Sequence, residues 1–356
     1  MRKKTQEVKI GDIKIGGDNP IAVQSMLSKP SDNIQENINQ AKELEAAGCD
    51  IIRVSVPDYD NIKLIHKLKE NIKIPVVADI HFDYKLVLES VYAGADKVRV
   101  NPGNIETEKY IKSIANMCNN YNVPIRIGIN SGSLEKNILE KYNKICAEAM
   151  CDSALYNIKL LEKYDFNNIV ISLKSSDVIM MIEAYRRMSE ICNYPLHIGV
   201  TEAGTEKMGV IKSSIGIGSL LVDGIGDTIR VSLTEDPVKE VHTGINILKS
   251  LNMYRNNINI VSCPTCGRTK IDIINITKQV EEILESQELS KNIKKSIKVA
   301  IMGCVVNGPG EAKDADVGIA GGNKCGVLFK HGQVIKKIPE QDLVSELIQE
   351  IKNMIL

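Results

Sequence analysis

The sequence predicts an α/β fold: a (β/α)8 barrel of the TIM type over residues 1–255, followed by a smaller α+β domain over residues 256–356. Short runs rich in β-branched residues alternate with segments of helical periodicity, which is typical of parallel strands joined by right-handed crossovers. Eight such units in about 250 residues match the size of a barrel. After residue 255 the alternation stops and a CxxC motif follows. A doubly wound open sheet is the alternative.

The predicted barrel strands recur at short intervals, at residues 21–26, 51–56, 75–80, 97–101, 124–130, 168–174, 195–201 and 228–233. Helical periodicity fills the intervals, as at residues 34–47, 106–120 and 176–192. The longest interval, 131–167, is expected to hold an extended loop and one long helix. No Gly-x-Gly-x-x-Gly follows the first strand, so a dinucleotide site is not indicated.

Two further segments complete the predicted fold. Residues 8–15 alternate around Gly11-Asp12, which predicts a small hairpin that covers the bottom of the barrel. Near the C-terminus the pattern predicts helices at 272–286 and 340–355 and strands at 297–302, 316–320, 325–330 and 333–338.

Composition limits the classes of partner. The net charge is +0, and the chain has three Phe and no Trp, so no basic surface or stacking platform indicates a nucleic acid. No apolar segment follows the basic residues 1–5, which predicts neither a signal peptide nor a membrane span. The nine cysteines, an odd number, favour thiols and a metal site in the cytoplasm over a disulfide framework.

The strongest motif is Cys263-Pro264-Thr265-Cys266, with a third cysteine, Cys304, 38 residues further on. Two thiolates three positions apart can hold one metal centre. No second CxxC follows Cys304, and the nearby candidates for a fourth ligand are Glu311, Cys325 and His331, of which Glu311 is the best placed. Three thiolates with a harder ligand favour an iron–sulfur cluster that reacts at one iron. Structural zinc is the alternative, because CPxCG is also common in zinc ribbons.

Polar side chains share one face of the predicted barrel strands, although barrel interiors are normally filled with Val, Ile and Leu. Burying several guanidinium groups without counter-ions is very unfavourable, and Asp79 is the only clear carboxylate on the strands. The face therefore predicts an anionic ligand such as phosphate or diphosphate. Its members are Arg53, Asp79, His81, Arg99, Asn101, Arg126, Asn130, Ser172, Lys174, His197 and Arg230.

Two assignments in this region have alternatives. Asp79 and His81 could serve acid–base chemistry, but Asp79 could equally neutralise a neighbouring arginine. Lys212-Ser213-Ser214 is predicted to begin a helix and to bind an anion there, and a plain capped helix is the alternative.

Seven motifs, spread nearly from end to end, resemble those of the 4-hydroxy-3-methylbut-2-enyl diphosphate synthase family. They are Ala78-Asp79-Ile80-His81, Asn101-Pro102-Gly103-Asn104, the run 126–135, Thr201-Glu202-Ala203-Gly204, the run 224–228, the CxxC motif and the run 302–312. One departure is the connection from Cys266 to Cys304, which looks longer than usual, with additional polar residues around 286–296.

The resemblance implies a [4Fe–4S] cluster on Cys263, Cys266, Cys304 and Glu311, and a homodimer arranged head to tail. It implies reductive ring opening and dehydroxylation of 2-C-methyl-D-erythritol 2,4-cyclodiphosphate to 4-hydroxy-3-methylbut-2-enyl diphosphate, with electrons from flavodoxin or ferredoxin. The expected catalytic residues are Glu311, Asp79, His81 and Glu202. The expected substrate-binding residues are Arg53, Arg99, Asn101, Arg126, Asn130, Ser172, Lys174 and Lys212.

Two functions from other classes compete with this hypothesis. The first is a barrel hydrolase or aldolase with a structural zinc domain. The second is a non-catalytic iron–sulfur carrier, against which the arginine-lined barrel argues, because a carrier needs no pocket for a diphosphate.

Overall fold

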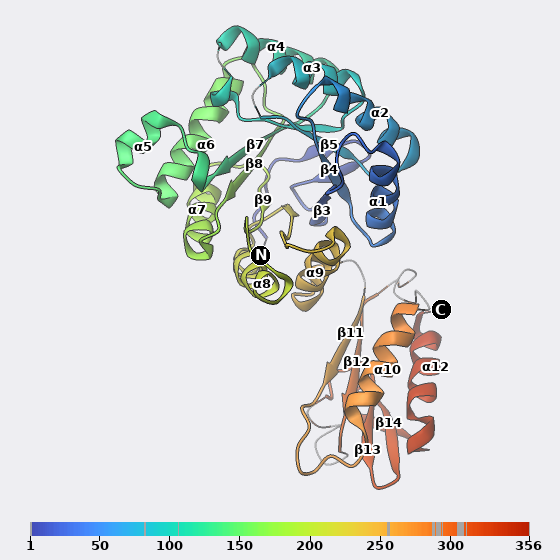
Figure 1. Ribbon diagram of the computed structural model, residues 1–356. Helices are drawn as coiled ribbons and strands as arrows, with labels where there is room; N and C mark the ends of the chain where they lie inside the picture. Colours follow the sequence, from blue (N-terminus) through green and yellow to red (C-terminus); the bar gives the residue numbers. More distant parts are fainter. Residues whose placement is uncertain are drawn as a thin grey trace. The chain divides into compact units, whose positions relative to one another are not determined.

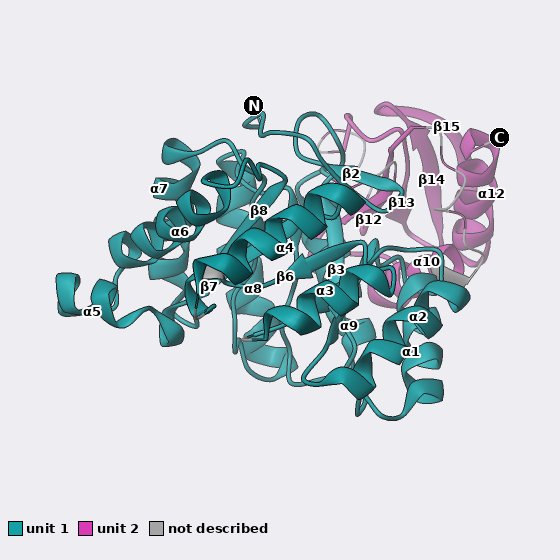
Figure 2. Ribbon diagram, turned by 90° about the horizontal axis from the view of Figure 1, so that it is seen from above, with its two compact units in different colours: residues 1–253 teal, residues 254–356 magenta. Residues whose placement is uncertain are grey.

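The computed structural model describes residues 2–81, 83–105, 107–254, 257–286, 289, 293, 295–304, 310 and 312–355, with the backbone alone at 102, 285 and 286. The chain divides into two compact units, Met1–Met253 and Tyr254–Leu356 (Figure 2). The sequence placed this division between residues 255 and 256.

Unit 1 contains eight parallel strands, in the order β8-β7-β6-β5-β4-β3-β10-β9. A parallel bridge between Ile171 and Leu196 joins β8 to the segment that leads into β9, so the sheet closes on itself. The predicted (β/α)8 barrel is confirmed, and the open sheet is wrong. The strands are β3 (Ala22–Met26), β4 (Ile51–Ser55), β5 (Val76–Asp79), β6 (Lys97–Arg99), β7 (Ile125–Asn130), β8 (Ile169–Lys174), β9 (His197–Ile198) and β10 (Thr228–Ile229).

Helices alternate with these strands and surround them (Figure 1). Several begin at a side chain that caps the free N–H groups of the first turn, such as Asp83 and Asp177. Pro237 starts another, because its fixed φ suits the first turn. The helices are α1 (Ile34–Ala46), α2 (Ile62–Asn71), α3 (Tyr84–Tyr92), α4 (Glu108–Tyr121), α6 (Ala147–Glu162), α7 (Val178–Ile191), α8 (Glu206–Val222) and α9 (Pro237–Ser250).

The interval 131–167 differs from the prediction of one helix. A short helix, α5 (Lys136–Tyr142), precedes α6. It ends at Asn143, whose left-handed conformation (φ 53°) stops the helix. Single turns of 3-10 helix also follow three strand ends: η1 (Tyr59–Asn61), η2 (Pro102–Asn104) and η3 (Ser131–Ser133).

The N-terminal hairpin, β1 (Val8–Ile10) paired with β2 (Ile13–Ile15), is present as predicted. Its buried side chains Val8, Ile10 and Ile15 form one apolar cluster, which we call the apolar plug, with residues near the starts of barrel strands: Ala22, Ile51, Val77 and Val170. The hairpin therefore closes the N-terminal end of the barrel, and this leaves the C-terminal strand ends as the side where a site can open.

Unit 2 is a five-stranded sheet in the order β11-β12-β13-β14-β15. The first three strands are parallel, and the last two pairs are antiparallel. Helices α10 (Ile273–Ser286) and α12 (Leu343–Ile355) pack their apolar faces on one side of the sheet, against residues such as Val299 and Ile319. The strands are β11 (Ile258–Ser262), β12 (Ile297–Met302), β13 (Val317–Gly322), β14 (Cys325–Lys330) and β15 (Gln333–Pro339), with a 3-10 turn η5 (Glu340–Asp342) before α12.

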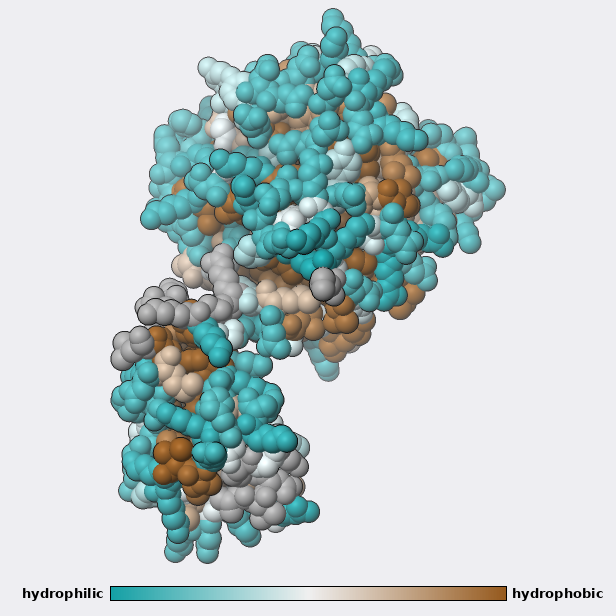
Figure 3. Space-filling view, turned by 180° about the vertical axis from the view of Figure 1, so that it is seen from behind, coloured by the Kyte–Doolittle hydropathy of each residue, from teal (hydrophilic) through white to brown (hydrophobic). Residues whose placement is uncertain are grey.

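In Figure 3 most of the visible face is hydrophilic, with hydrophobic residues in separate areas. In the described part of the chain, no helix combines the length and the apolar character needed to cross a membrane.

Candidate active site

Above the apolar plug, the side chains that face the barrel lumen become charged. The strand register pairs Arg53 with Val77 and Arg126 with Val170, so these charged residues share the inward face of the strands with members of the plug. All are buried or nearly so, since the most exposed side chain retains 17% of its accessible surface. We call this set the cation ring: Arg53, Lys97, Arg99, Arg126, Lys174 and Arg230.

Asp79 lies between two members of the ring. Arg99 Nη1 donates to Asp79 Oδ1 at 3.1 Å, and Arg53 Nε lies 3.6 Å from Asp79 Oδ2. Burial alone would raise the pKa of the Asp79 carboxyl, but the charges of Arg53, Arg99 and Arg126 outweigh it and hold this pKa below its usual value. Asp79 is thus an ionised partner of the arginines, which suits the neutralising role better than a proton-transfer role.

A second carboxylate, Glu240 of α9, was not predicted. Both of its oxygens lie 3.3 Å from Arg230 Nη2, and Oε1 also accepts the N–H of Leu233 at 2.9 Å. The sequence held one sign of this role, because Glu240 interrupts the apolar stripe of α9 formed by Val241, Gly244 and Leu248. A carboxylate in such a stripe must find a buried partner.

Several donors of the ring have no hydrogen-bond partner among the described residues. They are Lys97 Nζ, Lys174 Nζ, Arg230 Nε and, on Arg126, Nε and Nη1. Burial, with the added repulsion of Arg126, holds the pKa of Lys97 well below its usual value. Burial and the charge of Arg230 do the same for the pKa of Lys174. Six basic side chains face two carboxylates in the described part of the lumen, and this excess suits a ligand with several negative charges.

Lys97 was also missed by the sequence analysis, which assigned the polar face of its strand to Arg99 and Asn101. Its alternation with Arg99 was the available signal, because residues two apart on a strand share a face. His197 and Arg230 were noted on the polar face but not selected as site residues. His197 Nδ1 lies 2.7 Å from Thr228 Oγ1 in the buried lumen.

The Arg99 guanidinium lies against the backbone of β7 at Gly128. Arg99 Nη2 donates to the carbonyl of Gly128 at 3.0 Å, and a Cβ at position 128 would come within 2.4 Å of Arg99 Nε. Glycine is therefore needed there for close approach. The Asn101 amide also binds Gly128, accepting from its N at 2.7 Å and donating to its O at 2.9 Å. Asn101 thus secures β7 against β6.

The other predicted residues around the lumen differ in their placement. Ser172 Oγ donates to the carbonyl of Ile127 at 3.3 Å. His81 is exposed, with its ring nitrogens 3.3 and 3.4 Å from Arg99 Nη1. Asn130 is half-buried at the end of β7, whereas Glu202 is exposed after β9 and has a left-handed backbone (φ 52°).

The helix start expected at Lys212 is wrong. Helix α8 begins at Glu206 with Thr205 as its N-cap, so residues 212–214 lie inside the helix. Their N–H groups bond to carbonyls one turn earlier and are not available to an anion. The motif does not form the predicted anion site.

In unit 2, two cysteine-bearing loops meet where the parallel strands β11 and β12 end. The thiol sulfur of Cys263 accepts the N–H of Gly303 at 3.2 Å, and Lys270 N donates to the carbonyl of Gly303 at 3.0 Å. Cys304, the next residue, is half-buried, like Cys263, while Cys266 is exposed. The thiols of the CxxC motif and Cys304 therefore belong to one edge of the sheet.

This donor set fits a cluster bound by cysteine, since three thiols stand on adjoining loops. Hydrogen bonds from the backbone of Arg268 and from Thr269 lower the pKa of the Cys266 thiol, which favours the thiolate that a metal needs. Within the described ranges, no three His, Cys, Asp or Glu side chains are grouped closely enough for a single ion. Glu311 lies outside the described residues, as do most of residues 286–296.

The other two candidate ligands occupy opposite ends of one strand. Cys325 begins β14 and pairs with Gly322, so it lies at the sheet edge where β13 ends. His331 follows the far end of β14, and its N–H donates to the carbonyl of Ala315 before β13. The sheet geometry separates His331 from the cysteine loops.

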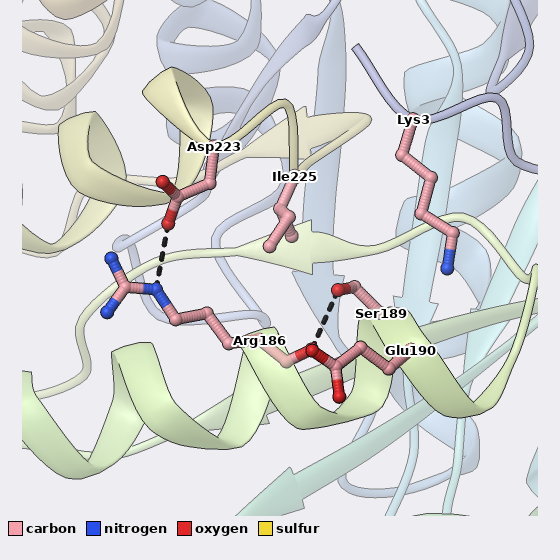
Figure 4. A pocket seen from close by; sticks show the side chains of 6 residues that line it. All are labelled: Lys3, Arg186, Ser189, Glu190, Asp223 and Ile225. Atoms are coloured by element: carbon pink, nitrogen blue, oxygen red, sulfur yellow. Dashed lines mark hydrogen bonds and ion pairs between the residues drawn. The ribbon is translucent and has the colours of Figure 1, made fainter. Parts of the chain in front are cut away.

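A shallow cavity near the N-terminal ends of the strands is unrelated to the ring. It is lined by Lys3, Arg186, Ser189, Glu190, Asp223 and Ile225 (Figure 4). Arg186 Nε donates to Asp223 at 2.8 Å and Ser189 Oγ donates to the Arg186 carbonyl, so these polar groups already satisfy one another. This cavity has no feature of a binding site.

Comparison with solved structures supports the barrel assignment. Unit 1 is similar to dihydropteroate synthase from Stenotrophomonas maltophilia (TM-score 0.52, 14% identity, covering 70% of this chain and 97% of that one). It is also similar to dihydropteroate synthase from Yersinia pestis (TM-score 0.50, 13% identity, covering 70% and 100%). At such identities the likeness concerns the fold alone.

Family models and curated relatives match both units. The GcpE TIM-barrel domain matches residues 5–245, and the GcpE protein C-terminal domain matches residues 259–353. The chain is 54% identical over 353 residues to "4-hydroxy-3-methylbut-2-en-1-yl diphosphate synthase (flavodoxin)" of Clostridium acetobutylicum, covering 99% of both proteins. The protein of the same name from Fusobacterium nucleatum is 51% identical, covering 100% of this chain and 98% of that protein. The chain belongs to the GcpE family, which the predicted resemblance had indicated.

Proposed function

We propose that this protein catalyses the reductive ring opening of 2-C-methyl-D-erythritol 2,4-cyclodiphosphate to 4-hydroxy-3-methylbut-2-enyl diphosphate, a step of isoprenoid precursor biosynthesis. Two electrons and two protons are taken up, one ring C–O bond breaks, a carbon–carbon double bond forms, and one hydroxyl group leaves as water. The observation that carries the proposal is the cation ring, whose buried donors greatly outnumber the two carboxylates of the described lumen. The names of the relatives support the choice of substrate and reaction.

The ring binds the diphosphate of the substrate. The free N–H groups of Arg126 and the ammonium group of Lys174 face the ligand, while Arg53 and Arg99 are oriented by Asp79. Guanidinium groups match the paired oxygens of a diphosphate, and their contacts strengthen in a lumen from which water is excluded. Asn130, Ser172, His81 and Glu202 complete the proposed site at the C-terminal strand ends.

Unit 2 would hold a [4Fe–4S] cluster on Cys263, Cys266, Cys304 and Glu311, the last assigned from its place in the sequence after Cys304 and from the family resemblance. When bound, the cluster supplies the two electrons one at a time. The thiols contribute by their position: Gly303 N–H orients the Cys263 sulfur, and the hydrogen bonds at Cys266 stabilise its thiolate.

Flavodoxin is the proposed electron donor, because the relatives carry it in their names, and ferredoxin is the alternative. A cytoplasmic location is part of the proposal, since a reducing compartment preserves the thiols. A head-to-tail homodimer is also proposed. Helix α8 supports self-association, because its outer face carries exposed apolar side chains, with exposed fractions of 47–67%, at Met208, Ile211, Ile215 and Val222.

The test is anaerobic purification with iron, sulfide and zinc analysis, followed by an assay of the cyclic diphosphate with reduced flavodoxin. We expect about four irons and four sulfides per chain, a brown colour that dithionite bleaches, and formation of the linear diphosphate. A colourless protein with one zinc and no turnover would contradict the proposal and favour a barrel hydrolase or aldolase.

A further inference from the structure

Three side chains outside the cation ring connect the loops that follow β6 and β7. The Glu135 carboxylate accepts Ser153 Oγ at 2.6 Å and Asn157 Nδ2 at 2.9 Å. On its other side, Asn157 Oδ1 accepts the N–H of Gly103 at 2.6 Å. Ser153 and Asn157 belong to α6, so one helix holds the loop that contains Gly103 and the loop that contains Glu135.

The contacts leave little freedom at this junction. Asn157 is 0% exposed, and each half of its amide has a different partner. A Cβ at position 103 would come within 2.9 Å of Glu135 Oε1 and 3.2 Å of Asn157 Oδ1. The 3-10 turn therefore lies directly against the carboxylate and the amide.

The junction leads to the cation ring through a short series of contacts. Gly103 lies in the turn η2, which Asn101 begins by accepting the N–H of Asn104 at 2.9 Å. The Asn101 amide holds the backbone of Gly128, whose carbonyl also accepts Arg99 Nη2. On the other loop, Glu135 follows Asn130 by five residues.

We infer that Glu135 and Asn157 are positioning residues of the cation ring: they fix Asn101, Arg99 and Asn130 for the diphosphate without touching it. The identity of the substrate rests on the proposed function, while the anion site itself rests on the ring. When the side chains of a site are already held by hydrogen bonds, they lose less conformational entropy on ligand binding. The hydrogen bonds of Glu135 and Asn157 therefore increase the affinity for the anion.

The inference is tested by exchanging the partners. Asn157→Asp replaces the amide donor, 2.9 Å from the Glu135 carboxylate, with a second carboxylate and should shift both loops. In the double variant Glu135→Gln with Asn157→Asp, the amide and the carboxylate trade places. Gly103 N–H keeps its acceptor, and Ser153 keeps an acceptor in the side-chain carbonyl at position 135. The contact of position 157 with the carbonyl of Ser153 is not restored, so recovery is incomplete.

Binding of inorganic pyrophosphate to the anaerobically purified holoenzyme is measured by calorimetry, together with kcat and KM for the cyclic diphosphate. We expect Asn157→Asp to weaken pyrophosphate binding and to raise KM by about tenfold, with a smaller change in kcat. The double variant should return to within about threefold of the wild type. Asn120→Asp, the same change at an exposed position of α4, is the matched control and should match the wild type.

Wild-type affinity in Asn157→Asp, or no recovery in the double variant, would overturn the positioning role. If Asn157→Asp does not fold, Ser153→Ala is used in its place, because it removes one hydrogen-bond donor to Glu135. This variant should bind pyrophosphate about threefold more weakly. Unchanged binding in Ser153→Ala would overturn the inference. If the wild type itself fails to bind pyrophosphate, the ring is not an anion site and the inference falls with it. Wild-type binding with no turnover would contradict the proposed reaction alone.

Discussion

At the scale of the residue, the cation ring depends on backbone shape as well as on charge. Gly128→Ala would place a methyl group 2.4 Å from Arg99 Nε and displace the guanidinium. We expect pyrophosphate binding to weaken about tenfold or more, because a bidentate contact is lost. Gly132→Ala is the matched control on the following turn, since a Cβ there meets nothing within 4 Å. Equal affinity in the two variants would show that the place of Arg99 is unimportant.

Two lysines of the cation ring predict that anion binding depends on pH. The pKa values of Lys97 and Lys174 lie well below the usual value in the protein without ligand, because burial disfavours the charged amine. A bound polyanion favours the charged amine and raises both pKa values, so binding takes up protons. Affinity therefore falls as the pH rises from the pKa of the free protein toward that of the complex.

Proton uptake is measured by calorimetry of pyrophosphate binding in buffers of different ionisation enthalpy. Lys174→Met should reduce the uptake, whereas Lys207→Met, at an exposed position of α8, should not change it. An uptake of zero in the wild type at every pH below the ordinary lysine pKa of about 10.4 at which the protein stays folded would contradict the assignment of these lysines to the site.

At the scale of the element, the hairpin β1–β2 contributes stability but no chemistry. Ile10 is fully buried in the cluster that closes the barrel, so Ile10→Ala should lower the free energy of unfolding by about 2–4 kcal/mol. Pyrophosphate affinity should stay within about twofold, because the buried side chains of the hairpin pack in an apolar cluster and carry no charge. Denaturant unfolding checks the first expectation, with the exposed neighbour Lys9→Ala as control.

Periodicity predicted the elements well but not all of their details. Alternating apolar positions located all eight barrel strands, since each must bury one face against helices. The short helix α5 was missed, because its seven residues carry too few apolar positions to show a period. The expected helix start at Lys212 was wrong because a Ser-rich segment can cap a helix or lie inside one, and only the position of Thr205 decides between them.

At the scale of the whole molecule, each unit has its own proposed role: unit 1 binds the anion and unit 2 supplies the electrons. Cys304→Ser should remove most of the iron and the visible colour, because one thiolate of the cluster is lost. It should leave pyrophosphate binding within about twofold, since the ring belongs to unit 1. Cys325→Ser, at the start of β14, should retain iron. Loss of iron from Cys325→Ser would make Cys325 the fourth ligand in place of Glu311.

The parts of the site that the sequence predicted are those that share a strand face or a motif. Arg53, Arg99 and Arg126 follow from alternation, and the cysteines from their spacing. Glu240 was not predictable in this way, because it reaches Arg230 from a helix whose packing only the fold determines. The support of Gly103 by Asn157 likewise joins residues 54 positions apart.

The apolar plug under the barrel has a consequence for the order of events in catalysis. Val8, Ile10 and Ile15 close the N-terminal end of the barrel, so the proposed substrate and its product would both pass the C-terminal strand ends. The proposed substrate and product therefore enter and leave on the same side of the barrel, and both bind to the cation ring. The linear diphosphate must therefore leave before another molecule of the cyclic diphosphate can bind. We expect accumulated product to act as a competitive inhibitor.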